Sequence, residues 1–123
     1  MRKAKDKAHY VDNKKFLQAM KEYKQECIDA EETDDVPVIS NYIGECFLKI
    51  AQGLSYRPNF INYTYRDEMI ADGIENCLQY IHNFNPEKSK NPFAYFTQII
   101  YYAFLRRIAK EKKQSHVKHE MIS

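Results

Sequence analysis

The spacing of apolar residues constrains this fold most, because they recur every three or four positions along four separate segments. In the first segment, Phe16, Met20, Tyr23 and Cys27 follow this spacing, which places them on one face of an α-helix. The chain has only three glycines and four prolines in 123 residues, too few for a turn-rich β-sandwich. We therefore expect one all-α domain, a small helical bundle of about four helices.

Local start and stop signals give the expected bounds of these helices. Asp12 or Asn13 suits the N-cap of the first helix, Thr64 with Asp67 forms a capping-box pattern before the third, and Asn91 suits the N-cap of the fourth. The expected helices cover about 13–30, 40–54, 65–83 and 91–113. The third would bury a stripe made of Ile70, Ile74, Cys77, Leu78 and Ile81. The domain would then span 12–113, after a basic flexible N-terminus at 1–11 and before a polar C-terminal tail at 114–123, where the chain could be truncated.

The distribution of charge and the cysteines indicate which cellular compartment the protein occupies. The formal net charge is only +2, but residues 2–7 and 106–118 are basic whereas 29–35 are acidic. The three cysteines lie far apart in apolar helical patterns, which favours buried free thiols in a reducing compartment. No segment approaches the roughly 20 apolar residues of a membrane span, and no apolar run follows the basic N-terminus as in a secretory signal. We expect a cytoplasmic protein.

Signals for catalysis or metal binding are weak. The sequence has no glycine-rich phosphate loop, no metal-spaced Cys/His set and no nucleophile with an obvious base partner, so we expect a non-enzyme without metal or other cofactor. His116 and His119 could share a helix face, but a solvated tail is the favoured interpretation. The acidic residues of the third helix lack the Glu-x-x-His pattern of bundle metal sites. On composition alone, a solvated face is favoured over a partner-docking face, and either over a metal site.

The fourth helix carries more apolar surface than a small core requires. Projected at about 100° per residue, one side holds Phe93, Thr97, Tyr101, Phe104 and Ile108. A second side holds Phe96, Ile99, Ile100 and Ala103, continues with Arg106, Arg107 and Lys110, and extends to Lys112 and Lys113. Cations neutralise phosphates and flat side chains accept unstacked bases, which suits nucleic acid. Cations are also favoured at a helix C-terminus by its dipole, so an interface for another helix is equally favoured at this point.

The order of motifs resembles region two of the bacterial sigma factors. "EMIADGIE" and "KNPFAYFTQ" are the specific part, and "YVDNKKFLQAM", "IAQGLS" and "HNFN" support it. Over roughly 10–113 the sequence is most similar to the late-transcription sigma factors of T-even-like bacteriophages. The resemblance implies a subunit that binds core RNA polymerase in the infected host cytoplasm and melts a TATA-like −10 promoter element. It also implies a coactivator and the sliding clamp as further partners, and no membrane.

The resemblance assigns roles to individual residues. Docking on the clamp helices of the largest polymerase subunit falls to Asp67, Glu68, Met69, Asp72, Gly73, Glu75 and Asn76. Phe84 matches an aromatic that holds flipped bases, and Phe96 one that stacks at the upstream fork. The full set implied for DNA binding is Phe84, Lys88, Lys90, Asn91, Tyr95, Phe96, Ile99, Ile100, Tyr102, Ala103, Arg106, Arg107, Lys110, Lys112 and Lys113.

Two departures from the sigma pattern imply weaker melting. Ile99 and Ile100 replace adjacent tryptophans and offer no π face, and Ala103 cannot hydrogen-bond a base edge. The hypothesis requires Phe96, Ile99 and Ile100 to lie open beside Arg106. The alternatives are a helical polymerase-binding adaptor or inhibitor that does not contact DNA, and, less favoured, a generic duplex-binding protein.

Overall fold

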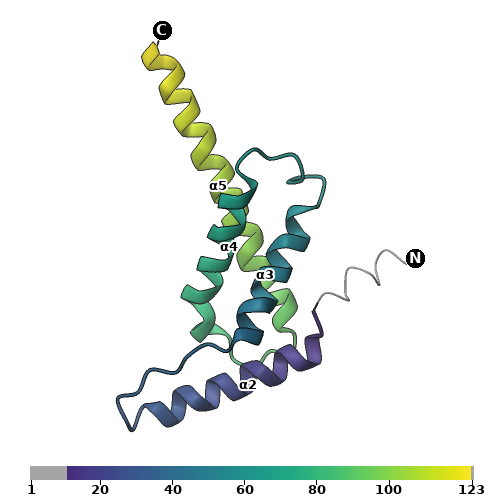
Figure 1. The fold of residues 1–123 in the computed structure, drawn as a ribbon, viewed down its shortest axis with the longest axis vertical. Coiled ribbons are helices and arrows are strands. Elements are labelled where there is room, and N and C mark those ends of the chain that lie inside the picture. The colour runs from purple at the N-terminus through teal and green to yellow at the C-terminus, as the bar shows by residue number, and fades with distance from the viewer. Residues whose placement is uncertain (1–10, 123) are drawn as a thin grey trace, which may run out of the picture.

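The computed structural model describes the backbone of residues 11–122 and the side chains as far as Gln114. Within this part the chain is all-helical and contains no strand. Its elements are α2 (Asn13–Ala30), α3 (Asn41–Ser55), α4 (Arg66–Tyr80), the short 3-10 helix η1 (Ile81–Asn83) and α5 (Pro92–Ile122). Helices α3, α4 and α5 form an upright group, α2 crosses its base, and the C-terminal part of α5 projects beyond the other helices (Figure 1). The expected all-α bundle is confirmed.

Side-chain caps fix three of the helix starts. The Asp12 carboxylate accepts hydrogen bonds from the amides of Lys14 and Lys15 at 3.1 and 3.3 Å. Ser40 Oγ accepts one from the amide of Ile43 at 3.3 Å, and Asn91 Oδ1 accepts one from the amide of Ala94 at 3.0 Å. Each cap satisfies an amide that has no partner within its own helix. The expected caps at Asp12 and Asn91 are confirmed.

The start of α4 differs from the expectation. The helix begins at Arg66, and its N-cap residue is Tyr65, which makes no side-chain cap hydrogen bond. The capping box expected from Thr64 is therefore wrong. Acidic Asp67 and Glu68 occupy the first turn instead, where the positive end of the helix dipole favours negative charge.

The ends of two helices also differ. The third expected helix is α-helical only to Tyr80 and finishes as η1. Helix α5 continues to Ile122, so the tail expected at 114–123 is helical as far as that residue. The basic N-terminus expected at 1–11 lies outside the described residues except for Val11, which is buried.

The core is built largely from phenylalanine rings. Phe96 contacts Phe16 of α2 and Phe47 of α3, with ring centroids 5.7 and 4.8 Å apart. Farther along α5, Phe104 meets Phe60 edge to face at 5.2 Å. Phe60 belongs to the α3–α4 loop and is 1% exposed, so this loop is packed against α5 rather than free.

Helices α4 and α5 approach closely at Gly73. A Cβ at this position would lie 2.9 Å from Ile100 Cγ2 and 3.1 Å from Phe104 Cε1, inside normal contact distance. Glycine is needed here for space, since its φ is not positive. The close approach sets which residues of α5 lie against α4.

The three cysteines are free thiols. Cys46 and Cys77 are buried, Cys27 is partly buried, and none of the three forms a disulfide, as expected. Burial raises the pKa of the Cys46 and Cys77 thiols. None of the helices in the described part of the chain combines the length and the apolarity needed to cross a membrane.

Candidate nucleic-acid and protein-docking surfaces

The face of α5 expected to receive bases is mostly buried. Phe96 and Ile100 are 0% exposed and Ala103 is 2% exposed, so the assignment of these three residues to a DNA-contacting surface is wrong. Periodicity identified the faces of the helix but not how many neighbours it has. Helix α5 packs against α2, α3 and α4 and therefore buries a wider arc than one stripe.

Phe84, expected to hold flipped bases, is also a core residue. Its ring is 1% exposed and packs against Tyr95 and Phe96, with centroids 5.2 and 5.7 Å away. The residue follows η1 in an extended conformation, which turns its side chain into the bundle. Its expected contact with DNA is therefore wrong.

The side of α5 expected to face the core does so. Phe104 is fully buried. Phe93, Tyr101 and Ile108 are partly buried and pack against the core, while Thr97 is partly buried with a hydroxyl that has no partner among the described residues. The inward face was therefore predicted correctly, but it is only part of the buried surface.

A different stripe of α5 faces solvent. At about 100° per residue, its members fall within an arc of about 80°. They are Tyr95, Ile99, Tyr102, Arg106, Lys110 and Lys113, which we call the outer stripe. Tyr102 is 50% exposed, the three cations are exposed, and Tyr95 and Ile99 are partly buried. All six were among the expected DNA-binding residues. Leu105, 40% exposed beside them, was not.

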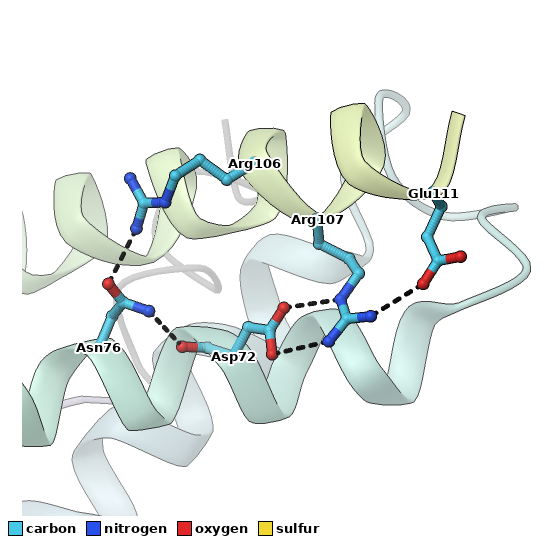
Figure 2. Close-up of polar contacts among 5 residues, drawn as sticks. All are labelled: Asp72, Asn76, Arg106, Arg107 and Glu111. Carbon is cyan, nitrogen blue, oxygen red and sulfur yellow. Dashed lines mark hydrogen bonds and ion pairs between the residues drawn. The ribbon is translucent and has the colours of Figure 1, made fainter. Parts of the chain in front are cut away.

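Arg107 is bound within the protein. Its guanidinium donates to both carboxylate oxygens of Asp72 at 2.7 and 3.0 Å and to Glu111 at 2.8 Å (Figure 2). These bonds raise the pKa of Arg107. The Arg107 side chain is 17% exposed. A bidentate carboxylate pair of this kind is strong and directional, so Arg107 joins α4 to α5. Its expected role in binding phosphate is therefore wrong.

Arg106 also links α5 to α4, through a single hydrogen bond. One of its terminal nitrogens donates to Asn76 Oδ1 at 2.8 Å, and Asn76 Nδ2 donates to the carbonyl of Asp72 at 3.0 Å (Figure 2). Since a guanidinium has five donors, this exposed side chain retains capacity for a phosphate. We call these five residues the seam cluster: Asp72, Asn76, Arg106, Arg107 and Glu111.

The expected polymerase-docking residues separate into three groups. Met69 is 0% exposed and Gly73 is buried, so neither can dock a partner, and that expectation is wrong for both. Asp72 and Asn76 belong to the seam cluster. The remaining three, which we call the outer carboxylates of α4, are exposed: Asp67, Glu68 and Glu75.

The exposure of Leu78 was missed. The helical spacing assigned it to the buried stripe of the third expected helix, of which Cys77 in α4 and Ile81 in η1 are indeed buried. Leu78 instead is 42% exposed and, at about 100° per residue, lies on the same outer side of the helix as Asp67, three turns farther along. The outer surface of α4 thus combines acidic and apolar side chains. Assuming a narrower buried stripe on this helix would have predicted that Leu78 is exposed.

The loop before α5 is mainly structural. Asn91 caps the helix and accepts a hydrogen bond from Asn13 Nδ2 at 2.8 Å, while Asn13 Oδ1 accepts one from the amide of Phe93 at 3.1 Å. Lys90 Nζ donates to the carbonyl of Pro86 at 3.1 Å. Lys88 is exposed, as are Lys112 and Lys113 near the end of the described side chains.

Among the described residues, no group of three His, Cys, Asp or Glu side chains could hold a metal ion; the side chains of His116 and His119 lie outside that part. No protein-family model matches the chain and no curated protein matches it.

Proposed function

We propose that the chain is a promoter-specificity subunit of the sigma-factor type, without catalytic activity, that acts in the cytoplasm of a phage-infected bacterium. The outer stripe of α5 is the observation that carries the proposal. It aligns an exposed aromatic, Tyr102, with three cations that have no ion-pair partner among the described residues. Such a surface suits a strand of nucleic acid, whose phosphates meet cations while a base meets a ring.

In this mechanism, cations hold the phosphates of promoter DNA. Among the described side chains of α5, the exposed cations are Arg106, Lys110, Lys112 and Lys113. Neutralising four phosphates predicts a slope of about −4 in a plot of log affinity against log salt concentration. Tyr102, with Ile99 and Tyr95 at its side, contacts bases of a TATA-like −10 element as they leave the stack.

The outer carboxylates of α4 dock on core RNA polymerase. Exposed carboxylates beside exposed Leu78 offer both charge and apolar area to a cationic helical partner. Opening base pairs costs a few kcal/mol per base, which one aromatic ring cannot offset. The proposed subunit therefore melts DNA only as part of the polymerase complex, with a coactivator and the sliding clamp as further partners.

Pull-down of core RNA polymerase, with and without promoter DNA, tests the proposal. Tyr102→Ala should leave polymerase binding intact and abolish permanganate reactivity of −10 thymines. Lys110→Gln with Lys113→Gln should reduce the salt slope by about two. Lys14→Gln with Lys21→Gln removes two exposed charges from α2 and serves as the matched control. Unchanged melting and an unchanged slope in the α5 variants would exclude the proposed DNA surface.

A second candidate is a helical adaptor that binds polymerase and inhibits it without contacting DNA. The burial of Phe84, Phe96 and Ile100 favours it, since the apolar wedge expected for melting is part of the core. It predicts that Glu68→Gln with Glu75→Gln abolishes both polymerase binding and inhibition. Under this candidate the lysine and Tyr102 variants described above would retain full inhibition.

A further inference from the structure

The segment 34–39 between α2 and α3 holds the two most exposed of the large apolar side chains in the described part of the chain. Val36 is 85% exposed and Val38 is 81% exposed. Pro37 and Ile39 are partly buried, and Ile39 packs against the core. Burial therefore alternates with a period of two, as in a β-strand with one covered face. The segment runs as an open connection along the edge of the bundle (Figure 1).

The backbone of this segment is unpaired within the described part of the chain. Among the described residues, no hydrogen bond uses an amide or carbonyl of residues 34–39. In an extended chain, the amides and carbonyls of Val36 and Val38 point to one side and those of Pro37 to the other. Since proline lacks an N–H, only the valine side offers a full set of donors and acceptors. A strand added there would pair with a complete edge.

Charge restricts what could pair with this edge. Four exposed carboxylates immediately precede the valines: Glu31, Glu32, Asp34 and Asp35. None of them forms an ion pair among the described residues, and the sequence has no lysine or arginine from Gln25 to Leu48. A shallow depression of about 360 Å³ beside them is lined by Glu26, Asp29, Ala30, Thr33, Asp35 and Pro37. A second copy of the segment offers these carboxylates no cation, and in parallel register it would bring like charges together, so self-pairing is disfavoured.

We propose that residues 35–39 dock as an added β-strand on a positively charged sheet edge of core RNA polymerase. Asp34, with a φ of 33°, turns the chain just before them. Val36 and Val38 would enter shallow apolar sites on that sheet, while the preceding carboxylates meet its cations. This is the strand-addition mode of peptide recognition, in which backbone bonds give affinity and alternate side chains give specificity. The inference rests on the proposed function, since it names polymerase as the partner, but it uses a surface separate from the outer carboxylates of α4.

Hydrogen exchange of the full chain, free and bound to core RNA polymerase, tests the inference. The amides of Val36 and Val38 should exchange at least about tenfold more slowly in the complex. Val38→Pro removes one edge N–H and keeps an apolar side chain, and should weaken binding about tenfold. Val38→Ile keeps the N–H and a β-branched apolar side chain, and should bind within about threefold of the unmodified chain. A thermal melt checks that both variants are folded.

The outcomes separate this inference from the proposed function. The inference is wrong if the complex forms and depends on Glu68 and Glu75, yet the Val36 and Val38 amides exchange as in the free chain. Val38→Pro binding as tightly as Val38→Ile would likewise reject it, and the proposed function would stand in both cases. If the chain does not bind core RNA polymerase at all, both the function and this inference fall.

Discussion

Phe96 is the residue on which the central part of the bundle depends. Its ring is fully buried and contacts the rings of Phe16, Phe47, Phe84 and Tyr95, with centroids between 4.8 and 5.7 Å away. Phe96→Ala would remove all these contacts and leave a cavity among rigid neighbours. We expect it to lower the free energy of unfolding by about 3–5 kcal/mol, measured by urea denaturation followed by circular dichroism.

Tyr102, six positions farther along α5, provides the comparison. Its side chain is half exposed, so Tyr102→Ala should change the free energy of unfolding by no more than about 0.5 kcal/mol. A Phe96→Ala protein as stable as the Tyr102→Ala protein would show that the Phe96 ring is not enclosed. Only in that case would the ring be available to stack on DNA.

At the scale of elements, the packing of α4 on α5 depends on the missing side chain of Gly73. An alanine Cβ would lie 2.9 Å from Ile100 Cγ2 and 3.1 Å from Phe104 Cε1. Neither neighbour can move freely, because Ile100 is β-branched and both residues are fully buried. The helix-propensity gain of about 1 kcal/mol is therefore opposed by about 1–3 kcal/mol of overpacking. We expect Gly73→Ala to lower the melting temperature.

Gly44 in α3 is the matched control for that change. A Cβ there meets nothing within 4 Å, so Gly44→Ala keeps the propensity gain and should raise stability by up to about 1 kcal/mol. Opposite shifts in melting temperature for the two variants would support the close approach of α4 and α5. Equal stabilisation by both would contradict it.

The seam cluster links the same two helices on their polar side. It joins residues that the sequence assigned to separate surfaces, since Asp72 and Asn76 were expected to face polymerase and Arg106 and Arg107 to face DNA. Charge periodicity along one helix cannot reveal that a carboxylate and a guanidinium from two helices face each other. The pairing depends on the helix–helix register, which the close approach at Gly73 sets.

For the whole molecule, the sequence predicted helix caps formed by near neighbours, but it predicted only part of the buried surface. Asp12 and Asn91 cap helices through contacts within three residues, so the sequence around them was sufficient. The burial of Phe84, Phe96 and Ile100 depends on how many helices surround α5. The spacing of residues along one helix does not reveal that number. The cap expected from Thr64 failed because Tyr65 is the N-cap of α4, one residue later than the motif requires.

Buried tyrosine hydroxyls and cysteine thiols make the bundle less stable at alkaline pH. Burial raises the pKa of Tyr23 and of Tyr42 from 10.0 to about 12, and it also raises the pKa of the Cys46 and Cys77 thiols. Between pH 10 and 12 the unfolded chain therefore loses protons that the folded chain keeps. Stability from these groups is fully present below their unfolded pKa values and falls as the pH rises toward the folded values.

Urea denaturation under reducing conditions at pH values from about 8 to 11.5 measures this dependence. We expect the free energy of unfolding to fall progressively above about pH 9, first through the thiols and then through the phenols. Tyr42→Phe removes one of these phenols and should make the decline between pH 10 and 11.5 shallower. A free energy of unfolding that stays constant to pH 11.5 would mean that these hydroxyls and thiols are open to water, and the packing of α2 and α3 described above would then be incorrect.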